Sequence, residues 1–225
     1  MVLVAQTRPR KNQEGVWTFD GKIGMFPFIF KEPALRSSRN RERGTMVTKA
    51  MTSVTKEVSR NFLVNKVLPA IKEKWPAEER GVPIYIQQDN AKTHIDVNDA
   101  QFVQVAQADG WNIHLMCQPP NSPDLNVLDL GFFAAIQSLF HKGTPNNVEQ
   151  IVKGIERAYE EYPLDKCNRI FLTQQACMME VMKTNGGHNY DVPHMKKKRL
   201  EMEGRLPTTL ECTVDIYNKA LQFLE

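Results

Sequence analysis

The chain has 225 residues, of which 41% are hydrophobic and 24% are charged, and its formal net charge is +3. This composition is typical of a soluble globular protein that is long enough to bury a core, and so small a charge neither favours nor excludes a nucleic-acid partner. The four cysteines have neither C-x-x-C nor paired Cys/His spacing, which argues against a zinc site and against a disulfide framework, and no apolar run approaches the roughly 18 residues of a membrane span.

The first 30 residues predict short strands joined by turns. Runs of β-type residues occur at 1–6, 16–19 and 26–30, and glycines punctuate them as in a meander of hairpins. Asp20 directly precedes a glycine, so we interpret it as a turn residue rather than a catalytic residue.

A run rich in arginine occupies residues 31–43. Such a run is usually a solvated loop, but in a protein that acts on polynucleotides it would also suit a surface that contacts phosphates. The sequence gives the two interpretations equal weight. The arginines are Arg36, Arg39, Arg41 and Arg43.

Apolar residues at helical spacing predict most of the remaining elements. From Thr45 to Trp75 they recur every three to five positions, which indicates one long or broken helix that ends before Pro76. The further helices are expected at residues 96–108, 127–141, 148–159, 167–182 and 214–224.

Two short apolar runs, at 84–86 and 113–116, have the length of strands and lead into acidic residues. Asp89 follows the first run, and Asp124 and Asp129 follow the second. Carboxylates at the carboxyl ends of strands often build the site of an α/β sheet, and oxygen ligands of this kind suit Mg²⁺. Spacing alone does not establish a metal site, because aspartates at strand ends are common.

The residues around these aspartates carry a close resemblance. The segments Q-D-N-A-K-T-H (88–94) and P-P-N-S-P-D-L-N-V-L-D-L-G-F-F (119–133) resemble the catalytic core of mariner-type transposases, above all their plant-type branch. The segments F-D-G-K-I-G (19–24) and P-H-M-K-K-K-R-L (193–200) resemble that branch as well. The resemblance identifies Asp89 as the second catalytic aspartate and Asp129 as the third.

The resemblance implies an α/β fold with a mixed RNase H-like sheet, flanking helices and a helical carboxy-terminal extension. We expect a partial catalytic domain over residues 1–143, incomplete at its first strand, and the extension over 144–225. Three carboxylates of the family hold two Mg²⁺ or Mn²⁺ ions for in-line phosphoryl transfer. The family's first catalytic aspartate, in a segment resembling D-E-K-W-F, and its helix-turn-helix region have no counterpart in this sequence. We therefore expect a truncated transposase that is inactive alone.

Other residues near the two motifs have plausible supporting roles. Asn90 and Lys92 lie beside Asp89, where a cation would help to hold phosphate. His94 has two possible roles in this pattern. It could orient DNA or a carboxylate, or it could be an ordinary polar residue at the start of a helix. Asp124 lies between prolines and Asn126, which favours a turn or capping role.

The expected partner is DNA, which would place the protein in the nucleus, and the resemblance also allows a homodimer. A second basic cluster near the carboxyl terminus is expected to contact DNA together with the arginines. It consists of Lys196, Lys197, Lys198 and Arg199. The alternative to a transposase fragment is a remnant that binds DNA or another partner without chemistry; a generic RNase H-like nuclease fits these motifs less well.

Overall fold

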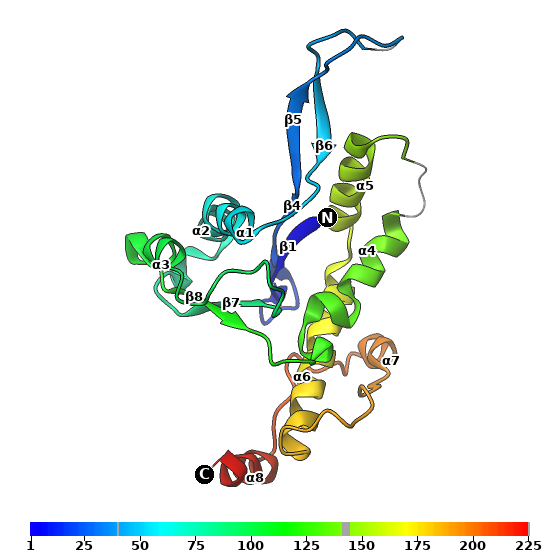
Figure 1. Cartoon of the computed structure of the whole chain (residues 1–225). Helices are drawn as coiled ribbons and strands as arrows, with labels where there is room; N and C mark the ends of the chain where they lie inside the picture. The colour runs from blue at the N-terminus through cyan, green and yellow to red at the C-terminus, as the bar shows by residue number, and fades with distance from the viewer. Residues whose placement is uncertain (40, 141–144, 225) are drawn as a thin grey trace. The chain divides into compact units, whose positions relative to one another are not determined.

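The computed structural model describes residues 1–39, 41–140 and 145–224, which form a mixed α/β structure with small sheets (Figure 1). Their contacts divide them into two units. The first comprises Met1–Thr7, Gly21–Cys117 and Ile136–Glu161, and the second comprises Arg8–Asp20, Gln118–Ala135 and Tyr162–Glu225. The division that the sequence predicts at residue 143 falls within residues 141–144, outside the described residues.

Two antiparallel strand pairs lie in the first unit. β1 (Val2–Gln6) pairs with β4 (Lys22–Pro27), and β5 (Ile29–Pro33) pairs with β6 (Met46–Ala50) in a hairpin. The strand predicted at 26–30 is correct in part, because β4 and β5 together cover it except at the buried Phe28, where one strand ends and the next begins.

The third strand pair of the first unit is parallel. β7 (Ile84–Gln88) pairs with β8 (Ile113–Cys117), with Ile84 opposite Ile113. Both predicted strands are therefore confirmed, and each extends slightly beyond its apolar run. Ile84, Ile113 and Leu115 are buried while Tyr85 is exposed, so the alternation of side chains directs one face of the pair toward the core.

The helix predicted from Thr45 to Trp75 is correct only in its second part. Residues 46–50 form β6, because the β-branched Val47 and Thr48 pair with β5. The helical part begins after Thr55, whose hydroxyl oxygen accepts a hydrogen bond from the Val58 amide. It runs through α1 (Lys56–Phe62), the π-helical turn η1 (Leu63–Val67) and α2 (Leu68–Lys74).

The core of the first unit lies where this broken helix meets β4 and α3 (Ala100–Ala106). Phe62, Leu68 and Phe102 are almost completely buried, and the Phe28 ring packs on Phe62 with 4.5 Å between centroids. The helix expected at 96–108 is thus shorter than predicted. The first unit also includes the helical segments η2 (Ala77–Glu79), η3 (Ala108–Gly110) and α5 (Val148–Glu160) and the second part of the helix at 133–140.

The second unit is built around the long helix α6 (Leu164–Lys183). Leu172 and Cys177 are fully buried on it, and the Phe132 ring packs edge-on against Tyr162 at 5.3 Å. The remaining elements are the strand pair β2 (Arg10–Lys11) and β3 (Trp17–Phe19), the turns η4 (Pro123–Leu125) and η5 (Leu128–Phe132), and the helices α7 (Lys197–Met202) and α8 (Val214–Leu224).

Helical periodicity predicts α5, α6 and α8 well, whereas α7 was not predicted. The helix expected at 127–141 is present as η5 followed by α4 (Phe133–Phe140), and its last residue lies outside the described residues. None of the helices in the described part of the chain has the length and apolar character to cross a membrane.

Candidate functional site

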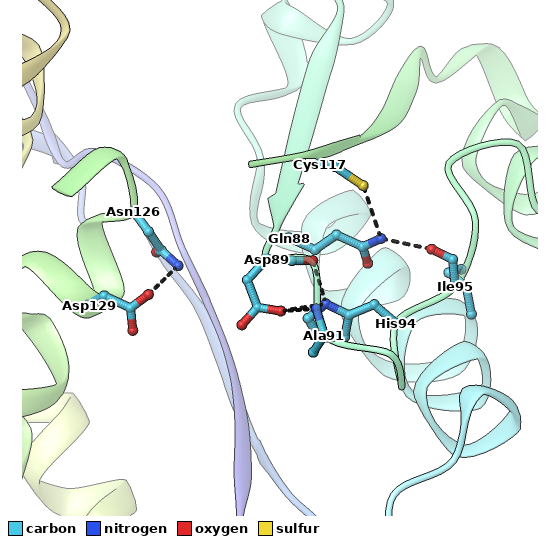
Figure 2. A network of polar contacts seen from close by, with 8 residues as sticks. All are labelled: Gln88, Asp89, Ala91, His94, Ile95, Cys117, Asn126 and Asp129. Carbon is cyan, nitrogen blue, oxygen red and sulfur yellow. Dashed lines mark hydrogen bonds and ion pairs between the residues drawn. The ribbon is translucent and has the colours of Figure 1, made fainter. Parts of the chain in front are cut away.

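Asp89 is the first residue after β7, at the carboxyl end of the parallel pair (Figure 2). Its Oδ1 accepts a hydrogen bond of 2.8 Å from the Ala91 amide, so the carboxylate stabilises the turn that follows the strand. The side chain is 51% exposed. In the described residues, Oδ2 of Asp89 accepts no hydrogen bond, which leaves one carboxylate oxygen for a ligand.

His94 closes the same loop back onto Asp89 (Figure 2). Its Nδ1 lies 3.0 Å from Oδ1 of Asp89 and 2.9 Å from the Asp89 carbonyl oxygen. Two acceptors at these distances place a proton on Nδ1, which leaves Nε2 to face away from the pair. The geometry therefore gives His94 direct contact with the carboxylate. Asn90 and Lys92, which lie in the same loop, are exposed.

Gln88 ties this loop to the neighbouring strand. Its Nε2 donates to the carbonyl oxygen of the buried Ile95 at 2.8 Å and lies 4.0 Å from Sγ of Cys117, the last residue of β8 (Figure 2). Sequence reasoning missed this residue. Its partners are seven and 29 positions away, and only the fold brings them together.

The loop that carries Asp89 ends at Asp99, the N-cap of α3. Oδ1 of Asp99 accepts from the Phe102 amide at 3.1 Å, and Oδ2 accepts from Nε of Arg60 on α1 at 2.8 Å. Burial raises the pKa of this carboxyl group, but the hydrogen bonds from Phe102 and Arg60 outweigh it, so the net pKa lies below the ordinary value. The charged Asp99 therefore anchors the far end of the loop.

Asp129 lies in the first turn of η5, in the second unit, and is exposed. The Asn126 side chain donates from Nδ2 to Oδ2 of Asp129 at 2.9 Å, while its Oδ1 accepts from the Leu128 amide at 3.0 Å (Figure 2). The same side chain also holds the Asp129 carboxylate, a contact that sequence reasoning did not anticipate.

Asp124 has the turn role that the sequence predicts. It lies within η4, and its carboxylate accepts a hydrogen bond from the Tyr190 hydroxyl. The turn is fixed further by Gln174 of α6, whose side-chain amide donates to the Leu125 carbonyl oxygen at 2.7 Å. Asp20 also precedes a turn glycine, since Gly21 has a positive φ of 70°.

The four arginines of the basic run lie between β5 and β6, where the hairpin turns (Figure 1). Arg36, Arg39, Arg41 and Arg43 are all exposed. The turn is held by a backbone bridge between Ser38 and Arg41. Their guanidinium groups are thus presented on one loop rather than packed into the core.

The second basic cluster is less uniform. Lys196 and Lys198 are exposed, but Lys197 is half-buried, and burial lowers its pKa. Arg199 forms an ion pair with Glu203, with Nε 2.7 Å from Oε1. Lys196 and Lys198 are therefore the cations of this cluster best placed to meet a phosphate.

The two candidate metal ligands belong to different units, Asp89 to the first and Asp129 to the second. A metal site that they share therefore stays a prediction. Both are oxygen donors of the kind that Mg²⁺ and Mn²⁺ prefer. Within the ranges that the structure describes, no three His, Cys, Asp or Glu residues gather in a group suited to a metal.

No protein-family model, curated protein or solved structure matches this chain.

Proposed function

We propose that the chain is part of the catalytic domain of a mariner-type transposase, an enzyme that cuts and joins DNA by metal-dependent phosphoryl transfer. One observation carries the proposal. Asp89, in the D-N-A-x-x-H segment that resembles the family, stands at the carboxyl end of a parallel strand pair, and His94 of the same segment contacts its carboxylate. A strand end is where an α/β sheet presents its catalytic groups.

The strand pairing supports an RNase H-like sheet as the underlying fold. The first unit contains an antiparallel pair, β1 and β4, and a parallel pair, β7 and β8. One further strand between β1 and β7 would join the two pairs into a single mixed sheet. In the family's sheet, this position belongs to the strand that the resemblance expects to be missing here.

Asp89 and Asp129 are the residues that would hold the metal, and the chain supplies two of the three carboxylates expected. A divalent ion there would activate water or a 3′-hydroxyl and stabilise the leaving oxygen. The Oδ1 atom of Asp89 is engaged by the Ala91 amide and by His94, and the Asp89 side chain is 51% exposed. DNA would be the partner, and the nucleus the compartment.

Mn²⁺ binding tests the pairing of the two aspartates. Carboxylates that share a metal site lie roughly 4–8 Å apart, with ions about 3.5–4 Å from one another. We expect weak binding that Asp89→Asn and Asp129→Asn each reduce to the level of the double variant, because both ligands serve one site. The free Mn²⁺ signal in electron paramagnetic resonance measures this, with Asp124→Asn as the matched control. Losses that add independently would mean that the two aspartates do not share an ion.

The alternative function is a remnant that binds DNA or another partner without catalysis. The exposure of all four arginines on the β5–β6 loop favours it, because such a surface can bind phosphates with or without a metal site. The genomic sequence upstream of this chain distinguishes the transposase fragment from the non-catalytic remnant. A D-E-K-W-like strand and a helix-turn-helix in the same reading frame would support a fragment of a working enzyme.

A transposase fragment and a DNA-binding remnant both predict DNA binding that depends on salt. Each cation that neutralises a phosphate contributes about −0.9 to the slope of log K against log salt for duplex DNA. Replacing Arg36, Arg39 and Arg43 by glutamine is therefore expected to flatten the slope by about 2–3 units. Fluorescence anisotropy with a labelled duplex at several salt concentrations measures it, and Lys153→Gln, an exposed cation on α5, is the control. No binding at low salt would contradict the transposase function and a DNA-binding remnant, and would leave only a remnant that binds another partner.

A further inference from the structure

The strand pair β2–β3 places two aromatic rings beside two cations. Arg10 lies opposite Phe19 and Lys11 opposite Trp17 in the register of the pair. The Arg10 guanidinium lies 5.0 Å from the centre of the Phe19 ring, and Nζ of Lys11 lies 4.3 Å from the centre of the Trp17 ring. Both distances are within the range of cation–π contacts. None of the four side chains is buried.

Arg8, at the start of this hairpin, is held by other residues of the second unit, to which the hairpin belongs. Nε of Arg8 donates to Oδ1 of Asn168 at 2.8 Å, its other nitrogens donate to Gln175 on α6 and to the Thr208 carbonyl oxygen, and Pro9 is buried. Residues 10 and 11 therefore leave a rigid anchor, and the aromatic and cationic groups beyond it keep a defined position.

The tip of the hairpin is also ordered by its own hydrogen bonds. Oδ1 of Asn12 accepts from the amides of Glu14 and Val16 at 3.1 and 2.9 Å, and the Gly15 amide donates to the Asn12 carbonyl oxygen at 3.0 Å. Gly15 has a φ of +81°, which favours glycine. No residue of β2 or β3 is buried, so the ordered hairpin presents its side chains at least partly at the surface.

We propose that the β2–β3 hairpin binds unpaired bases of single-stranded DNA, with Trp17 as the stacking platform and Lys11 and Arg10 as the phosphate contacts. The proposal rests on the proposed DNA function and names a substrate form for it. Binding sites for single strands combine aromatic side chains, on which bases stack, with cations that follow the backbone. The hairpin supplies both within a few residues, and Glu14 is the one acidic residue between Arg10 and Phe19.

The test compares single-stranded and duplex DNA on the full chain. Stacking on an aromatic residue predicts that Trp17→Ala weakens the binding of an oligo(dT) strand of about 15 nucleotides by about 5- to 150-fold. Trp17→Phe retains a ring and is expected to restore most of the affinity. Binding of a duplex of the same length is expected to change less than about 2-fold, because its bases are not available for stacking. Tyr217→Ala, which removes an exposed aromatic ring from α8, is the matched control.

Two further measurements distinguish the binding of single-stranded DNA by the hairpin from a purely structural role. Lys11→Gln is expected to lower the salt slope for oligo(dT) by about 0.7, the share of one phosphate contact on a single strand. Thermal unfolding of Trp17→Ala checks that the chain still folds. Equal losses for single-stranded and duplex DNA, or no loss for oligo(dT), would overturn the proposal. If the arginine variants still weaken duplex binding, the DNA function survives that failure; if no DNA binds at low salt, both fail.

Discussion

Purified chain 1–225 incubated with Mn²⁺ and DNA that carries matched terminal repeats is expected to leave the DNA uncut. Several oxygen ligands hold Mg²⁺ or Mn²⁺ in a protein. When too few of these ligands are anionic, they do not offset the cost of removing water from the ion. Under the proposed function, Asp89 and Asp129 would supply two of the three carboxylates that two-metal phosphoryl transfer needs. Without the third, neither ion is fixed to activate the nucleophile and stabilise the leaving oxygen. Gel electrophoresis of end-labelled DNA measures the outcome.

The double variant Asp89→Asn, Asp129→Asn serves as the control, because it keeps the shape of both side chains and removes their charges. Cleavage by the wild type that the double variant lacks would contradict an inactive fragment. It would mean that a third ligand comes from elsewhere, either from Asp20 or from a second copy of the chain. Cleavage that persists in the double variant would indicate a contaminating nuclease.

Asp99→Ala is expected to destabilise the first unit by about 2–4 kcal/mol. The substitution removes the N-cap of α3 and leaves the Arg60 guanidinium without the carboxylate that it contacts at 2.8 Å. The Asp99 side chain is only 10% exposed, whereas Arg60 is 33% exposed, so hydration of Arg60 offsets part of the loss. Urea unfolding followed by circular dichroism measures the change. Asp96→Ala, in the same loop but exposed, should change the stability by less than about 1 kcal/mol.

The contribution of Asp99 is also expected to depend on pH. Because its folded-state pKa lies below the ordinary value, the charged form stabilises the fold above the unfolded-state pKa of about 3.9. This stabilisation is lost as the pH falls through the lower folded-state pKa. The stability difference between wild type and Asp99→Asn should therefore stay constant above about pH 5 and shrink below about pH 4. A difference that grows on acidification would contradict the assignment.

How far the sequence predicts this fold depends on the kind of element. The strands β7 and β8 are short apolar runs bounded by Pro83 and Pro119, and local punctuation was sufficient to find them. The strand β6 was mistaken for helix, because the apolar residues at 46 and 47 continue the spacing of the helix that follows. Its pairing with β5 is a contact between segments, and periodicity within one segment carries no information about it.

The candidate site shows the same limit. The motifs around Asp89 and Asp129 select these aspartates by resemblance, and the predicted turn role of Asp124 agrees with its position in η4. The contacts of Gln88 and Asp99, which also hold the loop in place, were not foreseen. Gln88 reaches Ile95 and Cys117 only after β7 and β8 have paired, and a glutamine at a strand end has no sequence pattern that would reveal such a contact.

Each strand in the described residues pairs with only one other strand, and this affects the behaviour of the protein in solution. Among the described residues, the four sheets have two strands each, so β1 and β7 each keep one edge that no other strand of those residues covers. Backbone groups on such an edge can pair with another polypeptide, and β1 is rich in apolar residues. Protein concentration is therefore a variable in its own right. Dilute samples are expected to limit edge-to-edge pairing between copies, and concentrated samples to favour it.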